Sequence, residues 1–416
     1  MRFRRIRYLA ALAGVAMTSL VVAACGSGGG GSGGSSGTAT VPNDVNVGNF
    51  NLSFSALKSL KPVTKAGKGM VGVIMPDTTT SVRWVDFDAP YLKQAFEAAG
   101  YPSSDFKIAN AQGSDATQLA DAQADIAAGA TILIVAPLDN TVGDQIQQYA
   151  QQHGVKFIAY DRAIFTGTKT YYVSFDGKKV GEQIGTGFDQ CVSQWNISNP
   201  QVFELDGGED TDANAINFAQ GYNSVIWNTS NTPLKPPMTN SKGYKLVGDQ
   251  ITPGWVNATG GTIFQQQFTA NPNINATVEA NDGLAQAVIT DLKNKGIGPK
   301  KIPTTGQDAT LQGLVNTLQG FQCGTVYKPV YKEAEDAVAM ATILRAGLQP
   351  PARLLNGTTS PPQGAQGNTQ PASLLTSTWV TTANMSSTVV KDKFVDPASI
   401  CAAAGASVCS QYGINP

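Results

Sequence analysis

From Met70 onward, the sequence alternates between short apolar runs and longer amphipathic segments. Runs such as residues 70–75 (MVGVIM) and 131–137 (TILIVAP) have the length and apolar content of strands, and the helix-like segments between such runs end at Gly100, Gly129 and Gly154. The apolar runs show little polar alternation, which indicates that both of their faces are covered, as in a parallel sheet. Repeated strand–helix–strand units of this kind predict an α/β protein with doubly wound parallel sheets.

A second series of the same units begins after residues 171–176 and includes a predicted strand at 301–308. Units like those of the first series then follow. A Pro/Gly/Gln-rich loop at 349–371 precedes a last predicted strand at 373–382. A chain of 416 residues is long enough for two cores. We therefore predict two lobes joined by a multi-strand hinge, with a ligand cleft between them. Lobe 1 is predicted to contain residues 69–172 and 326–376, and lobe 2 residues 173–325 and 377–416.

Residues 1–24 have the layout of a secretory signal peptide. They begin with basic residues, continue through an apolar stretch that is short for a membrane span, and end in small residues directly before Cys25. The stretch VVAAC is similar to the lipobox of bacterial lipoproteins, in which the cysteine becomes the lipidated first residue. We therefore expect an extracytoplasmic protein anchored to the bacterial cell membrane by lipid on Cys25, with a flexible Gly/Ser tether at 25–45. A plain exported protein cut nearby is the alternative.

The mature chain would be acidic. Removal of residues 1–24 takes away four arginines and no acid, which lowers the formal charge from −1 to −5. No basic patch remains that could hold a phosphate backbone, so nucleic acid is not an expected partner.

The cysteines of the mature chain predict disulfides rather than metal binding. Their spacing shows no CxxC, and His153 is the only histidine, so we expect no zinc site and no cofactor. Export permits disulfides, and the short segment between Cys401 and Cys409 is flexible enough to close one. A pair of Cys191 with Cys323 is a looser expectation, because four cysteines allow three pairings.

Polar and aromatic residues follow the ends of the predicted strands. The segment 158–165 (IAYDRAIF), for example, runs from apolar residues directly into an acid and a base. Ligands of α/β proteins bind at the carboxyl ends of strands, although a charged strand end can also be a solvated turn. The candidate site residues found in this way are Arg83, Trp84, Asp161, Arg162, Asp212, Asn214, Trp255, Asn281, Asp308 and Lys328.

This mixture of side chains suits a sugar. Each sugar hydroxyl both donates and accepts hydrogen bonds, so planar carboxylate, amide and guanidinium groups can bind adjacent hydroxyls in pairs. The C–H face of a pyranose is apolar and packs well on an aromatic ring. Taken together, the candidate residues predict a sugar-binding pocket.

The chain resembles the periplasmic sugar-binding proteins of ABC transporters, of the ribose-binding structural type, and most closely their D-xylose-binding members. The resemblance covers about residues 69–395, and the order YDR, GQDA, YKP is a specific combination. The matching segments are RW (83–84), AYDRAI (159–164), YYVSFDGKKVGE (171–182), GDQITPGW (248–255), ANDGLAQA (280–287), TGQDATLQG (305–313) and TVYKP (325–329).

The resemblance implies a type I periplasmic binding protein fold and a receptor without enzymatic activity. Its lobes would close around one monosaccharide, D-xylose or a similar sugar, and a monomer would present that sugar to an ABC transporter permease. Among the candidates, Trp84 and Trp255 would line the sugar, Asp212 would match an aspartate of the family, and the others would bind the sugar by hydrogen bonds. The segment 209–215 (EDTDANA) departs from the family, with Ala213 where asparagine is usual, and this leaves the identity of the sugar open.

Other functions fit the sequence less well. An exported glycosidase would need a carboxylic acid with a raised pKa, whereas the nearby arginines and lysine favour ionised carboxylates. The acidic segment 206–214 (DGGEDTDAN) lacks the glycine and the final glutamate of a calcium loop, so no metal is expected there. The signal peptide excludes a transcription regulator. A receptor that presents the sugar to a membrane sensor kinase, or a binding protein for several aldoses, remains open.

Overall fold

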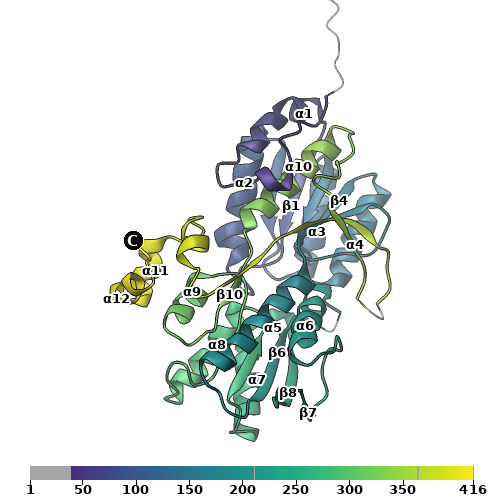
Figure 1. Cartoon of the computed structure of the whole chain (residues 1–416). Coiled ribbons are helices and arrows are strands. Elements are labelled where there is room, and N and C mark those ends of the chain that lie inside the picture. The colour runs from purple at the N-terminus through teal and green to yellow at the C-terminus, as the bar shows by residue number, and fades with distance from the viewer. Residues whose placement is uncertain (1–38, 210, 363–364, 416) are drawn as a thin grey trace, which may run out of the picture. The chain divides into compact units, whose positions relative to one another are not determined.

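The computed structural model describes residues 39–209, 211–362 and 365–415. Figure 1 shows the course of the chain, in which strands and helices alternate as the sequence predicts. The predicted signal peptide, Cys25 and most of the predicted tether lie outside the described residues. In the part of the chain that is described, no helix is both long enough and apolar enough to cross a membrane.

The first sheet has seven strands in the order β11-β12-β5-β4-β3-β1-β2. All neighbours are parallel except the edge strand β11, which runs antiparallel to β12. The strands are β1 (Met70–Met75), β2 (Phe106–Asn110), β3 (Ala130–Val135), β4 (Lys156–Tyr160), β5 (Thr170–Phe175), β11 (Gly357–Thr359) and β12 (Gln370–Leu375). Its helices are α1 (Lys61–Ala66), α2 (Ala89–Ala98), α3 (Asp115–Ala127), α4 (Asn140–Gln152) and α10 (Val330–Arg345).

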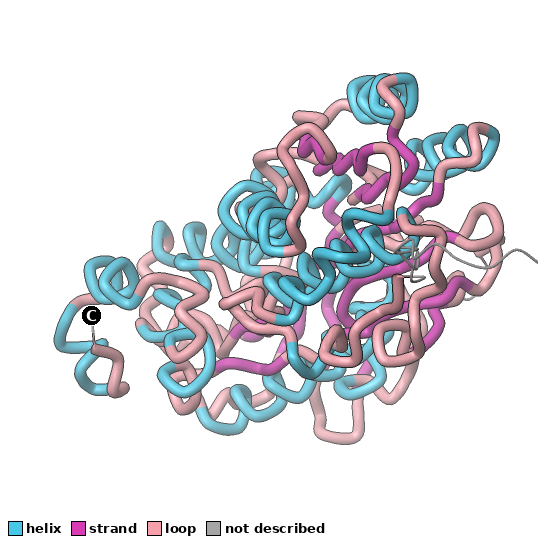
Figure 2. Tube along the Cα trace, turned by 90° about the horizontal axis from the view of Figure 1, so that it is seen from above, coloured by secondary structure: helices cyan, strands magenta, loops and turns pink. Residues whose placement is uncertain are grey.

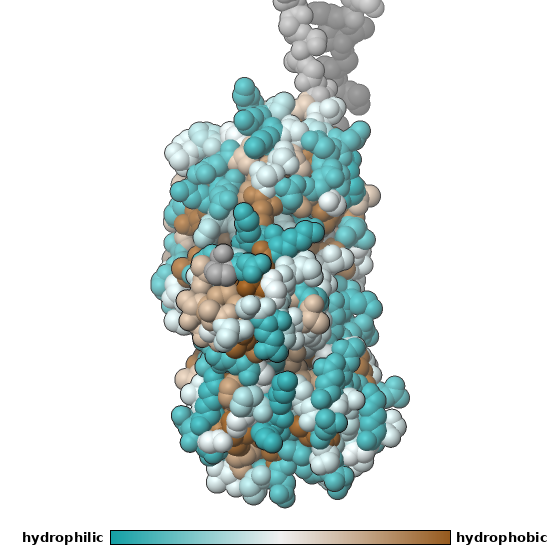
Figure 3. Space-filling model, turned by 60° about the vertical axis from the view of Figure 1, so that its left-hand side comes forward, coloured by the Kyte–Doolittle hydropathy of each residue, from teal (hydrophilic) through white to brown (hydrophobic). Residues whose placement is uncertain are grey.

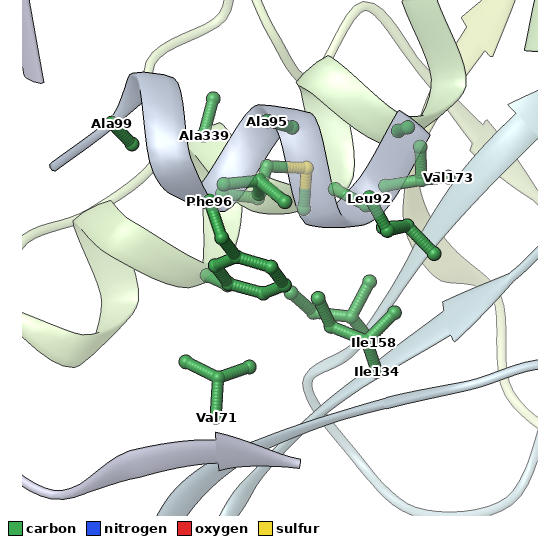
Figure 4. Close-up of a cluster of buried hydrophobic side chains, with 14 of the residues drawn as sticks. Val71, Leu92, Ala95, Phe96, Ala99, Ile134, Ile158, Val173 and Ala339 are labelled. Carbon is green, nitrogen blue, oxygen red and sulfur yellow. The ribbon is translucent and has the colours of Figure 1, made fainter. Parts of the chain in front are cut away.

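Helices α2 and α10 cover one face of this sheet with a continuous apolar core. Figure 4 shows Leu92 and Phe96 of α2 above Val71, Ile134 and Ile158 of the strands. These side chains are fully or almost fully buried, and each contributes roughly 1.5–3 kcal/mol through burial of apolar area. A separate cluster that includes Val142 and Ile146 of α4 packs on the other face. The two-sided cover explains why the strands lack polar alternation.

Residues before the first strand also belong to this core. Val45, Phe50, Leu57 and Leu60 are buried against it. The predicted start of lobe 1 at residue 69 is therefore too late, and the predicted tether ends in a residue that is part of the packed structure. This stretch shows no strand or helix periodicity in the sequence, because it folds as short helical turns and the six-residue helix α1.

The second sheet has four strands in the order β7-β8-β6-β9, and only β7 is antiparallel to its neighbour. Its strands are β6 (Gln201–Gly207), β7 (Met238–Thr239), β8 (Lys245–Thr252) and β9 (Ala276–Glu279). Its helices are α5 (Gly177–Gln194), α6 (Ala213–Ile226), α7 (Asn257–Ala270), α8 (Asp282–Asn294) and α9 (Leu311–Leu318). Helices α5 and α6 approach closely, because a Cβ atom on Gly181 would lie 2.1 Å from the carbonyl oxygen of Phe218.

Two predicted strands differ in the structure. Residues 301–308 run extended beside β9 but form only an isolated bridge to β10 (Thr325–Tyr327) through Gln307. The predicted strand at 373–382 is two strands in different sheets, because the chain leaves β12 and then forms β13 (Thr378–Val380), which pairs with β10.

The chain crosses between the sheets after β5, after β10 and after β12 (Figure 1). The predicted two-lobe α/β architecture with a multi-strand hinge is confirmed. The predicted boundaries at 172 and 325 fall inside β5 and β10, so the crossings come a few residues later in each case. We retain the division into two lobes with these adjusted limits as our proposal.

The C-terminal segment forms α11 (Pro397–Ala404) and α12 (Ala406–Gln411), which lie at one edge of the view in Figure 2. A disulfide joins Cys401 to Cys409, with Cα atoms 5.6 Å apart. A second disulfide joins Cys191 of α5 to Cys323, with Cα atoms 5.7 Å apart. Short helical turns complete the structure at Val47–Asn49, Ala56–Leu60, Trp84–Asp88, Pro253–Trp255 and Ser386–Val390.

Candidate ligand-binding site

All ten candidate residues from the sequence line one cavity, together with Thr80, Ser81, Phe218 and Gln307. The volume of this cavity that the centres of water molecules can occupy is about 40 Å³. One water requires roughly 10–15 Å³ on this measure. The space suits one small molecule rather than a polymer. Two larger hollows, of about 430 and 770 Å³, share lining residues with the cavity.

The cavity lies where the strands of both sheets end. Asp161 and Arg162 follow β4, and Asp212 and Asn214 begin α6 soon after β6. Asn281 caps the N-terminus of α8 by accepting the backbone N–H of Leu284 at 2.8 Å. The remaining candidate residues follow β1, β8, the extended segment 303–307 and β10, while Phe218 lines the cavity from within α6. Because the carboxyl ends of parallel strands share one edge of a sheet, residues far apart in sequence meet here.

Arg83 is the most highly connected side chain of the cavity. Its Nη1 donates to Asp161 Oδ2 at 2.6 Å, and its Nη2 donates to Asp88 Oδ1 and to Glu333 Oε2, both at 2.8 Å. Its Nε donates to Asp88 Oδ2 at 2.9 Å, which completes a bidentate pair. Arg83 is only 2% exposed, so these contacts fix its guanidinium in a water-poor environment.

Asp161 is the carboxylate on which the cations of the cavity converge. Lys328 Nζ lies 3.9 Å from Asp161 Oδ2 and 3.0 Å from Asp308 Oδ1. Burial raises the pKa of Asp161, but the charges of Arg83, Lys328 and Arg162 outweigh it, and the net shift is downward. Asp161 is therefore held ionised, as an acceptor of hydrogen bonds rather than a proton donor.

Glu333 lies behind Arg83 and differs from Asp161. Burial, only partly offset by Arg83, raises the pKa of Glu333 well above its ordinary value. The same order of effects raises the pKa of Asp88. Neither residue lines the cavity, so both position Arg83 and neither is placed to contact a ligand.

Trp84 packs beneath two guanidinium groups. The Arg83 Cζ atom lies 4.7 Å from the ring centroid, and the Arg162 Cζ atom lies 5.4 Å from it. Arg162 is held in turn by the carbonyl oxygens of Pro137 and Leu138, each 2.9 Å from Nη1. The ring is 2% exposed, so Trp84 presents only a small part of its surface to the cavity.

Trp255 lines the cavity from the second sheet and depends on a glycine. A Cβ atom on Gly207 would lie 1.9 Å from the ring of Trp255, so no other residue at the end of β6 would leave this space. Trp255 Nε1 donates to Asp212 Oδ2 at 2.8 Å, while Asp212 Oδ1 accepts the backbone N–H groups of Asn214 and Ala215. One carboxylate thus caps α6 and orients the tryptophan.

Three lining residues have left-handed backbones. The φ angles are +60° at Asp161, +59° at Trp255 and +94° at Asp308. Such conformations cost of order 1–3 kcal/mol each for residues other than glycine and are concentrated at functional sites. Here they turn side chains toward the cavity directly after extended segments.

Several contributors were not predicted from the sequence. Gln307 lines the cavity, and its Oε1 is buried without a hydrogen-bond partner among the described residues. Gln307 lies in the GQDA stretch, so its neighbour Asp308 was a usable signal. Asp88 and Glu333 lie on helical segments, and nothing in the local sequence indicates that both face Arg83.

Comparisons with known proteins agree on the class of this fold and site. A model of the periplasmic binding protein domain matches residues 71–349. The D-xylose-binding periplasmic protein of Escherichia coli (strain K12) is 34% identical over 290 residues, which cover 69% of this chain and 80% of that protein. The multiple sugar-binding periplasmic receptor ChvE of Rhizobium radiobacter is 30% identical over 298 residues, covering 70% of this chain and 81% of that protein.

Solved structures show the same fold. A solute-binding protein of an ABC transporter from Clostridium phytofermentans, with bound β-D-glucose, superposes with a TM-score of 0.68 at 22% identity, covering 80% of this chain and 99% of that chain. A carbohydrate transporter solute-binding protein from Chloroflexus aurantiacus, in complex with D-glucose, has a TM-score of 0.64 at 24% identity. The match covers 79% of this chain and 97% of that chain. Both solved proteins are solute-binding proteins of transporters, and the names of both curated relatives describe sugar-binding proteins. The chain is accordingly a sugar-binding protein and not an enzyme. The chain therefore belongs to the periplasmic binding protein family.

Proposed function

We propose that this chain is a lipid-anchored, extracytoplasmic receptor that captures a monosaccharide between its lobes and delivers it to an ABC transporter permease. One observation carries the proposal: ten strand-end residues, selected because their chemistry suits a sugar, line a single buried cavity. D-xylose is our first candidate for the ligand.

The charges of the cavity favour a neutral ligand. Its lining contains three basic residues and three acidic residues, which are Arg83, Arg162, Lys328, Asp161, Asp212 and Asp308. An additional charge on the ligand would be buried without a partner, which is costly, whereas hydroxyl groups can join the existing network. Phe218 and the two tryptophans supply apolar surface for the C–H face of a sugar ring.

The names of the relatives support sugars as the class of ligand more strongly than they support any single sugar. The name of the Escherichia coli relative gives D-xylose, while that of the Rhizobium radiobacter relative gives multiple sugars. A receptor for several aldoses is therefore our second candidate. Both candidates use the same residues and differ only in how tightly the cavity fits the ring substituents.

Capture is proposed to occur by closure of the lobes about the crossings after β5, β10 and β12. Val82 and Leu311, both exposed, line the hollow of about 770 Å³ that also includes Asn281 and Asp308. The distance between these exposed apolar residues would change as the lobes close. The permease could therefore distinguish the liganded form from the empty form by this apolar surface.

Isothermal titration calorimetry with a panel of monosaccharides tests the proposal. We expect D-xylose to bind with one site per chain, and D-glucuronate, a charged sugar acid, to bind far more weakly than neutral aldoses. Comparable affinities for D-xylose, D-glucose and L-arabinose would favour the second candidate. If no neutral monosaccharide bound to folded protein, the proposed function would be wrong.

A further inference from the structure

Three carboxylates lie together inside the second sheet, outside the ligand cavity. Glu204 and Asp206 point to the same face of β6, because they are two residues apart on a strand. Asp249 of β8 is the partner of Glu204 in the parallel ladder, so it shares that face (Figure 1 shows β6 and β8 side by side). One oxygen from each carboxylate lies within 4.8 Å of the others, and the residues are 0%, 2% and 6% exposed.

Neutral donors hold Glu204 and Asp249 by one oxygen each and Asp206 by both, because the Thr232 hydroxyl donates to Asp206 Oδ2 at 3.3 Å. Trp227 Nε1 donates to Glu204 Oε1 at 2.6 Å, and the backbone N–H of Leu234 donates to Asp249 Oδ2 at 2.5 Å. Tyr222 donates its hydroxyl to Asp206 Oδ1. Anchoring of this kind resembles the outer shell of metal sites, where hydrogen bonds to one ligand oxygen orient the other.

The remaining oxygens are left open. Glu204 Oε2 and Asp249 Oδ1 are buried and have no hydrogen-bond partner among the described residues, and no lysine or arginine forms an ion pair with the cluster there. The negative charge of three buried carboxylates is stable only if protons or a cation compensate it.

A cavity next to the cluster would admit a cation. A cavity of about 640 Å³ is lined by Asp206, Thr232 and Leu234, all of which belong to the cluster or contact it. Of the three carboxylates, Asp206 lines this cavity and the other two do not, so an ion and its waters would reach the cluster on the side of Asp206. An all-oxygen set of ligands suits hard divalent cations and does not suit zinc.

We propose that Glu204, Asp206 and Asp249 form a binding site for a divalent cation, with Ca²⁺ as the first candidate. Ca²⁺ accepts 6–8 oxygen ligands in flexible geometry, which three carboxylates and several waters can provide. This inference departs from the expectation from sequence that the chain binds no metal. Of the acidic segment 206–214, only Asp206 takes part, and the other two ligands come from elsewhere in the sheet.

The site is independent of the proposed sugar site, because none of the three carboxylates lines that cavity. Full-length protein stripped with a chelator should bind about one Ca²⁺ per chain in equilibrium dialysis. A dissociation constant on the order of 10⁻⁴–10⁻³ M would be typical of extracellular calcium sites. Glu204→Gln and Asp249→Asn should each weaken binding at least tenfold, whereas Glu97→Gln, at an exposed position on α2, should leave it unchanged.

Terbium luminescence gives a second readout that does not depend on the carboxylate variants. Tb³⁺ replaces Ca²⁺ at oxygen sites, and here it would lie close to the indole of Trp227, so excitation of tryptophan should sensitise its emission. Added Ca²⁺ should quench this emission by competition, and Trp227→Phe should reduce it. Absence of Ca²⁺ binding to the wild-type chain at about 10 mM, ten times the upper end of the expected range, would overturn the proposal. Equal binding by the wild type and both carboxylate variants would also overturn it, because the ion would then lie elsewhere.

Discussion

Arg83 shows how a single buried residue can organise a ligand cavity. It contacts Asp88, Asp161 and Glu333, yet only Asp161 faces the cavity. The two other carboxylates hold the guanidinium in place, so a ligand meets an arginine whose rotamer is already fixed. The entropy of ordering this side chain is therefore lost on folding and not on binding, which favours affinity.

Replacement of Asp161 tests the cavity directly. Asp161→Asn keeps the shape and suits the positive φ of this residue, but it removes the charge that Arg83 and Lys328 contact. Loss of a hydrogen bond to a charged group costs roughly 1.5–3 kcal/mol, so the affinity for D-xylose should fall about ten- to a hundred-fold. Calorimetry on the wild type and the variant measures the ratio.

Asp121→Ala is a suitable control, because Asp121 is half-buried on α3 and does not line the cavity. Its affinity for the sugar should equal that of the wild type. If Asp161→Asn bound as tightly as this control, Asp161 would not contact the ligand. Complete removal of the side chain is a poorer test, because breaking a buried ion pair destabilises a fold by about 3–5 kcal/mol.

A buried glutamate should make the stability of the protein depend on pH. Burial, partly offset by hydrogen bonds from Thr277 and Thr305, raises the pKa of Glu279 to about 8. The folded state then holds a proton that the unfolded state releases near pH 4.5, so this stabilisation is present at acid pH and is lost as the pH rises through about 8. The loss amounts to at most about 5 kcal/mol.

Glu279→Gln should flatten this dependence, since an amide keeps the shape and does not ionise. We expect the free energy of unfolding, measured in urea, to fall less between about pH 5 and pH 8 than in the wild type. The exposed Glu97→Gln should retain the wild-type slope. Equal slopes for all three proteins would show that Glu279 is ionised throughout this range.

The residues of the cavity were predictable where a charged or polar residue directly follows a predicted strand in the sequence. Asp161 comes directly after an apolar run, and Lys328 directly after another, so the strand ends identify both. Asp88 and Glu333 could not be found in this way, because Asp88 reaches Arg83 within the helical turn Trp84–Asp88 and Glu333 reaches it only through the packing of α10. The role of Glu333 depends on a tertiary contact, and that of Asp88 on the geometry of a turn that follows no strand.

At the level of elements, the sequence predicts the repeated units well and the crossings less well. The strand predicted at 373–382 divides because the chain changes sheets at Thr376 and Ser377, where Ser377 and the side chain of Gln183 exchange hydrogen bonds. Nothing in the apolar run marks this point, since both halves are strand-like. The strand β11 was also missed, because it is a three-residue edge strand within a Pro/Gly-rich loop.

The two disulfides should differ in their effect on stability. In the chain-entropy model, a cross-link stabilises more as the loop it closes becomes longer. The separations of 132 residues for Cys191–Cys323 and 8 for Cys401–Cys409 correspond to about 5 and about 2.5 kcal/mol. Serine substitution of both cysteines in each pair, followed by denaturant unfolding, should give the larger loss for the first pair. A larger loss for the second pair would contradict the model.

At the scale of the whole molecule, the face shown in Figure 3 is mostly hydrophilic, with apolar residues scattered over it. The two sheets and their covering helices were predictable, because βαβ repetition extends over most of the chain. The participation of residues 45–63 in the first core was not, because a short turn-rich segment acquires its apolar contacts only from the folded lobe.

The proposed lipid anchor predicts where the full-length protein is found in the cell. Lipid on Cys25 should hold the protein on the membrane fraction. Cys25→Ser should release it or leave an unprocessed precursor. Fractionation followed by immunoblotting distinguishes these outcomes, and an unchanged membrane fraction with Cys25→Ser would show that another feature holds the protein there.

The contact between Gly207 and Trp255 also has a consequence for evolution. Any side chain at position 207 would occupy the place of the indole ring, since even a Cβ atom would lie 1.9 Å from it. Descendants of a common ancestor should therefore vary at these two positions together, with the glycine preserved wherever the tryptophan is. A lineage that exchanges the tryptophan for a smaller residue becomes free to lose the glycine, and its cavity can then diverge toward a different sugar.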